Sequence, residues 1–242
     1  MIEIVELQKR FGAVRAVANV SFTARNGSIT GLLGANGAGK TTTLRMIAGV
    51  LRHESGSVRV DGCSEKDIPV QRHLGALLDH AGLYARLTVR EHFVYFGELY
   101  VLSRKYINDR TNELLAVLGL SGAADRRVGE LSQGQRMKVA LGRAMIHSPQ
   151  NLLLDEPTNG LDVPTVRSLR AVLIQMRDSG LCIVFSSHVL EEVQALCDTV
   201  VILAHGVSVA CGSPGEVCRQ TGTTSLEKAL LSMASESEAE HA

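Results

Sequence analysis

The feature that most constrains this chain is a glycine-rich octapeptide that ends in a lysine and a threonine. Residues 34–41 fit GxxxxGK[ST] and follow an apolar run, Ile29 to Leu33, that is typical of a buried strand. Glycines let the backbone curl so that successive amides point at one anion. Lys40 can then reach the β and γ phosphates, Thr41 can ligate Mg²⁺, and a helix starting near Lys40 adds its positive end. A plain glycine-rich turn would need neither the strand nor the helix, so the pattern predicts a nucleotide phosphate cradle. The expected nucleotide-binding residues of this segment are Gly34, Ala35, Asn36, Gly37, Ala38, Gly39, Lys40, Thr41 and Thr42.

The composition argues against a large electrostatic binding surface. The 242 residues include 25 Lys+Arg and 25 Asp+Glu, so no strong field favours nucleic acid or an anionic membrane. The first residues, Met1 to Leu7, carry acids instead of a basic leader, and no apolar run approaches the roughly 18 residues of a membrane span. We therefore expect a chain that neither crosses a membrane nor is exported. The five cysteines show no CxxC spacing and are expected to be reduced and mostly buried.

The order of patterns along the chain predicts one α/β domain with a helical insertion. β-rich runs open the chain, and short apolar strands alternate with helices from residue 148 onward, which favours a mostly parallel sheet. Between them, residues 86–147 are helical in pattern and begin with the capping box Thr88-Val89-Arg90-Glu91. We expect a domain over 1–225, with a core of 1–85 and 148–225 and a helical subdomain of 86–147. Residues 226–242 are expected to form a short helix and an acidic, frayed tail.

Three further polar groups are expected near the phosphate cradle. The strand Leu152 to Asp155 ends in two carboxylates, of which Asp155 would face the metal and Glu156 would act as general base or orient the attacking water. His188 follows the strand Leu181 to Phe185, so it should emerge at the same sheet edge and could hydrogen-bond the γ-phosphate.

A second anion site is expected at Leu131-Ser132-Gln133-Gly134-Gln135, where Ser132 is a plausible N-cap of a helix. This LSxGQ segment precedes the Asp155-Glu156 strand, with the phosphate loop upstream and Ser187-His188 downstream. The combination resembles the ATP-binding cassette (ABC) ATPases over about residues 1–220. The resemblance implies a P-loop NTPase fold: an ABC-ATPase core, an N-terminal antiparallel β subdomain and an inserted α-helical subdomain.

The resemblance also implies roles, a mechanism and partners. Phe11 would stack on adenine, residues 34–41 would be Walker A, and Asp155 and Glu156 Walker B. The D-loop would contain Asp162, and the in-trans signature would be Ser132, Gln133, Gly134 and Gln135. Two ATPase subunits, here expected to be a homodimer, would sandwich ATP and Mg²⁺ head to tail and drive a separate integral-membrane permease. No nucleic acid is expected as a partner. The subunit would be cytoplasmic and peripheral on the inner face of the membrane.

Two positions depart from the family pattern. Gln133 stands where glycine is commonest, at a tolerant position. Asp79 stands where the family usually has its Q-loop glutamine; an aspartate can ligate Mg²⁺ but cannot donate a hydrogen bond, which predicts a metal-contacting or coupling role. Together with Gly82-Leu83-Tyr84, this replacement resembles the sodium-exporter (NatA-like) branch. Sodium or drug export is therefore the first expectation for the cargo.

Two other classes of function compete with a transporter motor. One is a soluble ABC protein that uses ATP-driven closure to grip ribosomes or DNA, but such proteins usually fuse two cassettes or carry a long coiled coil. The other is a P-loop kinase with a small acceptor, for which the sequence offers no acceptor site and which would leave the LSxGQ segment without a purpose.

Overall fold

The computed structural model describes residues 1–64, 68–78, 82–223, 225–230 and 232. Asp79 and the acidic end of the chain lie outside these residues, so their expected roles are not addressed by the structure. The strands are β1 (Ile2–Phe11), β2 (Val14–Ala24), β3 (Ser28–Leu33), β4 (Ser55–Val60), β5 (Cys63–Ser64), β6 (Leu74–Leu77), β7 (Asn151–Asp155), β8 (Cys182–Ser187), β9 (Thr199–Ala204) and β10 (Val207–Gly212). The helices are α1 (Lys40–Ile47), α2 (Ile68–Gln71), α3 (Val89–Leu99), α4 (Arg104–Val117), α5 (Gln133–Met145), α6 (Val163–Asp178), α7 (Leu190–Leu196) and α8 (Pro214–Gln220), with 3₁₀ turns η1 (Ser121–Ala123) and η2 (Val128–Glu130).

One mixed sheet organises the core, in the order β5-β4-β1-β2-β10-β9-β3-β8-β7-β6. The run β9-β3-β8-β7-β6 is entirely parallel, as the short apolar strands predicted. Leu33 pairs with Ser187 and Asp155 with Ser186, so β3, β7 and β8 end level with one another. The loops that follow these three strands therefore meet at one edge of the sheet.

The first strands form an antiparallel unit beside this core. β1 pairs with β2 and β4, and it contains register shifts around Glu6, whose φ is 48°. A single parallel pair, Val207 with Asn19, joins this unit to the rest of the sheet. Phe11 at the end of β1 and Val14 at the start of β2 lie close to the loop after β3, since they line one cavity with Asn36 and Gly37.

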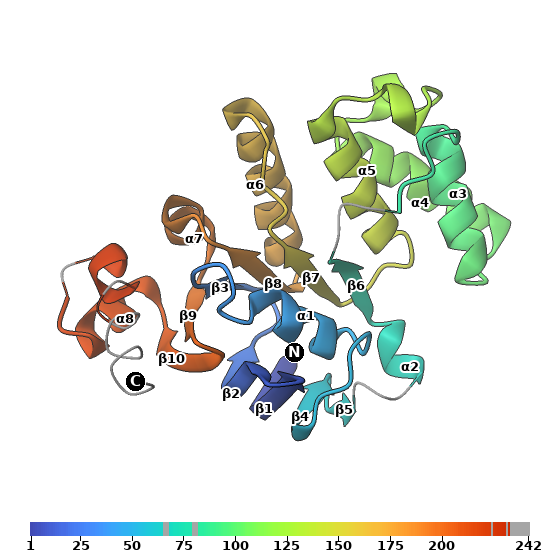
Figure 1. The fold of residues 1–242 in the computed structure, drawn as a ribbon. Helices are drawn as coiled ribbons and strands as arrows, with labels where there is room; N and C mark the ends of the chain where they lie inside the picture. The colour runs from blue at the N-terminus through green and yellow to red at the C-terminus, as the bar shows by residue number, and fades with distance from the viewer. Residues whose placement is uncertain (65–67, 79–81, 224, 231, 233–242) are drawn as a thin grey trace.

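Helices cover both faces of the parallel strands. α1 packs on one face, where Leu44 and Ile47 join a buried cluster with Leu153 and Val184. α6 and α7 cover the other face, where Leu173 and Val193 join a second cluster (Figure 1). Successive residues of a strand point to opposite faces of the sheet, and helices cover both faces. The parallel strands are therefore apolar along their whole length.

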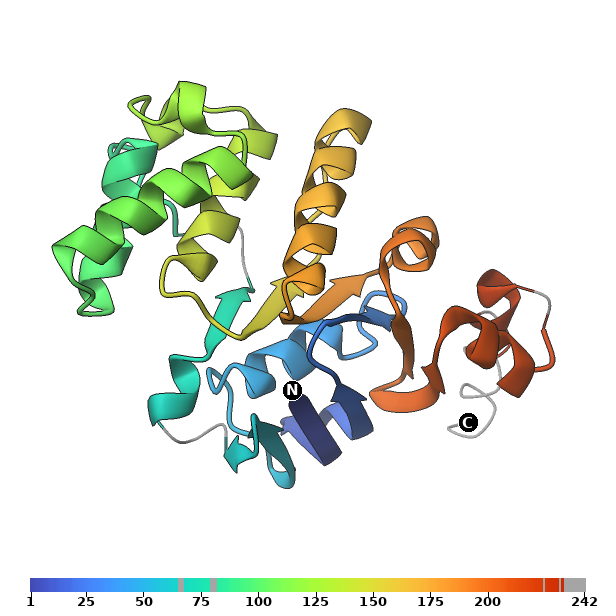
Figure 2. The same ribbon diagram turned by 180° about the vertical axis from the view of Figure 1, so that it is seen from behind.

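Three longer helices, α3, α4 and α5, form a separate lobe between β6 and β7 (Figure 2). The predicted capping box of α3 is confirmed: Thr88 accepts from the Glu91 amide, and Glu91 accepts from the Thr88 amide. Close packing of α3 on α5 depends on Gly142, since a methyl group there would lie 2.3 Å from Cζ of Phe93. The lobe is thus held by helix caps and tight apolar packing.

Two details differ from the sequence-based expectations. β7 begins at Asn151, a polar residue that is fully buried because its side chain bonds Asp61 and the His73 carbonyl. The cysteines are free as expected, but two of them are exposed: Cys63, on β5 at the edge of the sheet, and Cys211 on β10. Among the described helices, none is both long and apolar enough to cross a bilayer.

Candidate nucleotide-binding site

The loop of residues 34–39 joins β3 to α1 and runs very close to two neighbouring strands. Gly39 has a φ of 98°, and a methyl group there would lie 2.7 Å from the carbonyl oxygen of Ala16. At Gly34 a methyl group would lie 2.4 Å from the carbonyl oxygen of Leu203. Both obstacles are backbone atoms, which cannot move aside as a flexible side chain can. Only glycine lets the loop curl here.

Lys40, the first residue of α1, is buried and folds back over this loop. Its Nζ donates to the carbonyl oxygens of Gly34 at 2.7 Å and Ala35 at 3.1 Å, and lies 3.7 Å from Oε1 of Glu156. Burial lowers the pKa of Lys40, while the carboxylates of Glu156 and Asp155 act in the opposite direction. The result is a desolvated cation pointed at the inside of a glycine loop.

Asp155 ends β7 as the innermost carboxylate of the site. Its Oδ1 accepts a 2.5 Å hydrogen bond from Oγ of Ser186, and the same Oγ accepts from the amide of Glu156 at 3.0 Å. Ser186 was not among the predicted site residues. The only signal for it in the sequence is its position near the carboxyl end of a buried strand, next to Ser187 and His188.

Glu156 and His188 meet just outside this pair. Nδ1 of His188 lies 2.9 Å from Oε2 of Glu156, although the two residues follow different strands. Glu156 adopts a φ of 45°, a left-handed backbone conformation that non-glycine residues rarely adopt. The strand alignment at this sheet edge therefore brings together Lys40, Asp155, Glu156 and His188, as the sequence predicted.

A cavity of ≈ 690 Å³ opens beside these groups. It is lined by Phe11, Val14, Arg15, Ala16, Ala18, Asn36, Gly37, Gly39, Lys40, Thr41, Thr42, Glu156 and His205. Phe11 is 50% exposed, with Nζ of Lys9 5.5 Å from its ring centroid, and an exposed aromatic ring can stack on a base. Arg15 and His205 belong to no motif and were missed by the sequence analysis. Of the other predicted residues, Gly34 and Ala35 accept from Nζ of Lys40 through their carbonyl oxygens, and Ala38 is buried in the core.

The predicted second anion site begins α5 and is not part of this cavity. Ser132 caps the helix: its Oγ accepts from the Gln135 amide, and Oε1 of Gln135 accepts from the Ser132 amide. Among the described residues, the lining of the nucleotide cavity includes none of 132–135. One chain therefore presents this helix end away from its own phosphate loop (Figure 1).

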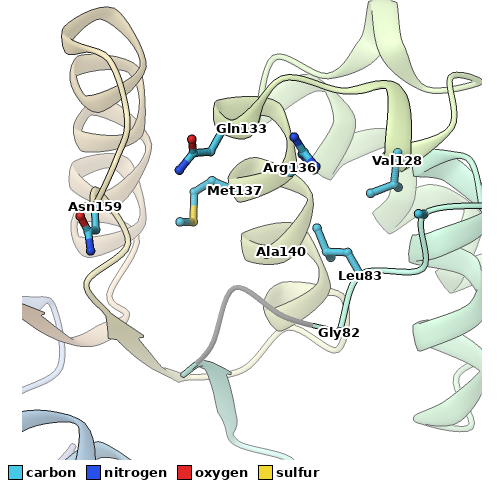
Figure 3. A pocket seen from close by; sticks show the side chains of 10 residues that line it. Gly82, Leu83, Val128, Gln133, Arg136, Met137, Ala140 and Asn159 are labelled. Atoms are coloured by element: carbon cyan, nitrogen blue, oxygen red, sulfur yellow. The ribbon is translucent and has the colours of Figure 1, made fainter.

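Gln133 instead points toward the loop that follows β7. Figure 3 shows its side chain on α5 and that of Asn159 on the loop after β7; both line a second cavity, of ≈ 430 Å³, together with Met137 and Leu83. Its Nε2 lies so near Gly160 that a methyl group there would approach it to 2.8 Å. Gln133 therefore lies close to the loop after β7 of the same chain, an approach that glycine at this position could not make.

Asp162 is the last residue of the loop between β7 and α6. Its Oδ1 accepts from the Thr165 amide at 3.0 Å, which makes Asp162 the N-cap of α6. Hydrogen bonds from Thr165 lower the pKa of this carboxyl.

Comparison with known proteins assigns the chain to a family. The family described as ABC transporter matches residues 17–159. The chain is 42% identical over 220 residues to the ABC transporter ATP-binding protein NatA of Bacillus subtilis (strain 168), covering 88% of this chain and 89% of NatA. It belongs to the ABC transporter ATP-binding family.

Other relatives agree with this membership. The bacitracin transport ATP-binding protein BcrA of Bacillus licheniformis is 33% identical over 209 residues, which cover 85% of this chain and 67% of BcrA. A solved structure of the ATP binding subunit of an ABC transporter matches with a TM-score of 0.86 at 28% identity, covering 96% of this chain and 98% of that one. The ABC membership makes this chain an ATPase and makes ATP the nucleotide of the family.

Proposed function

We propose that this chain is the motor subunit of an ABC exporter, and that two copies close head to tail around two ATP molecules. The proposal rests on one observation: two groups of expected ATP-binding residues lie apart from one another within a single chain. Lys40, Asp155, Glu156 and His188 meet at one sheet edge, whereas the serine-capped end of α5 lines no part of their cavity. A second copy would supply Ser132 and Gly134 to the phosphates that the first copy holds.

In this proposal the free chain must rearrange when it binds ATP. The Lys40 ammonium would exchange the carbonyl oxygens of Gly34 and Ala35 for phosphate oxygens, which form stronger, charge-assisted hydrogen bonds. The loop amides and the positive end of α1 would hold the same phosphates. Phe11 would stack on the base at the exposed side of the cavity.

Mg²⁺ fits the donors available at this site. The described residues contain no group of three or more His, Cys, Asp or Glu that could hold a metal ion by itself, so the ion would share Thr41, Asp155 and phosphate oxygens. When bound, it would neutralise charge on the phosphates. Ser186 would keep Asp155 oriented toward it.

Hydrolysis would then depend on Glu156 and His188. Glu156 would orient or deprotonate the attacking water, and the 2.9 Å contact with His188 would hold the carboxylate in that direction. Asp162 and the rest of the D-loop would contact the facing copy. Loss of the bridging phosphate would let the two copies separate.

For the permease, we propose docking at the cavity shown in Figure 3, between the core and the helical lobe. Leu83, Met137 and Ala140 make its walls apolar, and the exposed rings of Tyr84 and Tyr95 lie beside one another on the same lobe, 5.3 Å between centroids. An apolar end of a cytoplasmic permease helix would bury this surface and hold the subunit at the inner face of the membrane.

The proposed cargo is sodium or a drug. The likeness to NatA and to the bacitracin transport protein BcrA supports an exporter, and a permease would select the cargo. We expect pulldown of the tagged chain from membranes to recover a multi-span membrane protein. Recovery of ribosomes instead would overturn the transport role.

The enzymatic part has a separate test. The purified chain should hydrolyse ATP only with Mg²⁺, and Lys40→Ala should abolish the activity, while Lys105→Ala, at an exposed lysine of α4, should not. The variant Ala85→Arg, which projects into the docking cavity, should keep the ATPase activity of the isolated chain but lose the membrane partner.

A further inference from the structure

A glutamate on α7 connects two loops of the site that are far apart in sequence. Oε2 of Glu192 accepts a hydrogen bond from Oγ1 of Thr158 at 2.5 Å and a second from Oγ of Ser187 at 3.1 Å. Thr158 belongs to the loop after β7, and Ser187 is the last residue of β8. One carboxylate oxygen therefore holds both segments.

Both hydrogen-bond donors lie next to segments with a role in the proposed reaction: Thr158 precedes the D-loop, and Ser187 precedes His188. The Thr158 carbonyl accepts from the amide of Leu161, the residue before Asp162. Oγ of Ser187 also accepts from the amide of Val189 at 2.9 Å. Ser187 precedes His188 and bonds the amide of the residue after it, so it fixes the backbone on both sides of His188. Thr158 accepts a backbone hydrogen bond within the turn that leads to the D-loop.

A simpler explanation for Glu192 is an acid in the first turn of a helix, where it interacts with the positive helix end. Glu191 occupies the same turn and is exposed, so it offers this effect without the two hydrogen bonds. Nor is Glu192 half of a structural ion pair: no Lys, Arg or His nitrogen of the described residues forms a salt bridge with it. Its bonding partners are two hydroxyl groups, one of which belongs to the buried Ser187.

We infer that Glu192 is a positioning residue that couples the D-loop to the loop of His188. It acts through Thr158 and Ser187 and does not touch the nucleotide. The inference rests on the proposed function, because it assigns to Glu192 the transmission of D-loop contact with a facing copy to the hydrolytic group. A shift of the turn at Thr158 would pull on the same carboxylate that holds Ser187.

Removal of the carboxylate leaves two hydroxyls without their shared acceptor, while the phosphate loop is untouched. In Glu192→Ala we expect kcat for ATP hydrolysis to fall about tenfold, with the Kd for ATP unchanged within about twofold. Glu192→Gln retains an acceptor oxygen and should restore most of kcat. Glu191→Ala, the matched control, should behave as wild type.

A second substitution tests the route. Thr158→Val removes one of the two donors, so its loss of kcat should not add to that of Glu192→Ala in the double variant. Equal kcat in wild type and Glu192→Ala, an equal loss in Glu191→Ala, or fully additive losses in the double variant would each overturn the inference. Because these results require an active wild type, they are distinct from a failure of the proposed function, in which the wild type itself would not hydrolyse ATP.

One measurement needs no turnover. The ¹H–¹³C signal of the His188 ring, assigned with His188→Gln, should shift in Glu192→Ala and in Thr158→Val but not in Glu191→Ala. Thermal denaturation of the same samples reports folding. A His188 signal that stays in place in both folded variants would contradict the coupling, whatever the activity of the wild type.

Discussion

The His188 ring and the Glu156 carboxylate lie 2.9 Å apart, Nδ1 to Oε2, at the ends of two adjacent parallel strands. The backbone around Glu156 is held from β8 as well, because its amide donates to the carbonyl and to Oγ of Ser186. The positive φ of Glu156 persists because these bonds determine it. The side chain proposed to activate water is therefore oriented by the neighbouring strand.

We expect Glu156→Gln to lower ATP turnover by roughly two orders of magnitude or more, the usual effect of removing a general base. The amide keeps the size of the side chain and can still contact His188, so ATP binding should remain. Stopped turnover should leave an ATP-bound dimer, visible by size-exclusion chromatography with light scattering. The control is Glu113→Gln, an exposed carboxylate of α4. Wild-type turnover in Glu156→Gln would remove Glu156 from its role.

A comparison of alanine substitutions at two glycines, one inside the phosphate loop and one outside it, tests the close packing of that loop. Gly39 and Gly180 have φ values of 98° and 100°, but only at Gly39 would a methyl group meet backbone, the Ala16 carbonyl oxygen at 2.7 Å. Gly180→Ala should lose about 1 kcal/mol of unfolding free energy from the backbone conformation, and Gly39→Ala should lose more because its methyl group also meets backbone. Only Gly39→Ala should also weaken ATP binding, by about tenfold or more, measured by calorimetry. Unchanged affinity in Gly39→Ala would show that the close approach to β2 is unimportant for the nucleotide.

The buried His92 side chain should make the free energy of unfolding depend on pH. It is fully buried on α3 against the rings of Tyr84 and Phe96, and neither ring nitrogen has a hydrogen-bond partner in the described part of the chain. Burial, assisted by the charge of Arg143, lowers its pKa from 6.5 to about 4. Between these values the unfolded chain binds more protons than the folded one, so stability is present above pH 6.5 and is lost as the pH falls.

The corresponding loss is about 2 kcal/mol between pH 8 and pH 5. In His92→Phe this part of the acid destabilisation should disappear, as measured by urea unfolding at both pH values. His73→Gln, at an exposed histidine, should keep it. An identical pH dependence in wild type and His92→Phe would refute the assignment.

The cysteines should differ sharply in reactivity. Burial raises the pKa of Cys182 to about 11 and also raises that of Cys197, whereas Cys63 is exposed on β5. At pH 8 only about 0.1% of Cys182 would be thiolate, the reactive form. Iodoacetamide should therefore modify Cys63 at least about 100-fold faster than Cys182 or Cys197, as followed by peptide mass spectrometry. Comparable rates in the folded chain would contradict the buried positions of Cys182 on β8 and Cys197 after α7.

Much of the fold followed from local patterns in the sequence. Apolar strands that end in polar groups predicted the parallel core, and the sequences at Thr88 and Ser132 predicted two helix caps, because a cap is formed by residues three apart. The level ends of β3, β7 and β8 then brought Lys40, Asp155, Glu156 and His188 together.

Contacts between distant loops could not be predicted in this way. The bonds of Ser186 to Asp155 and of Glu192 to Thr158 join residues more than 30 positions apart, and serine, threonine and glutamate are ordinary surface residues in any local pattern. The cysteines were expected to be mostly buried, yet Cys63 is exposed on β5, because composition cannot distinguish an edge strand from a central one. Gln133 was given little weight, yet its side chain approaches Gly160.

The rate of ATP hydrolysis per chain, measured over a range of protein concentrations, tests the central claim most directly. If each chamber needs a facing copy, the rate per chain should rise with concentration as dimers form, and Ser132→Arg should remain inactive throughout. A rate per chain that stays constant down to concentrations where light scattering detects only monomers would contradict the account.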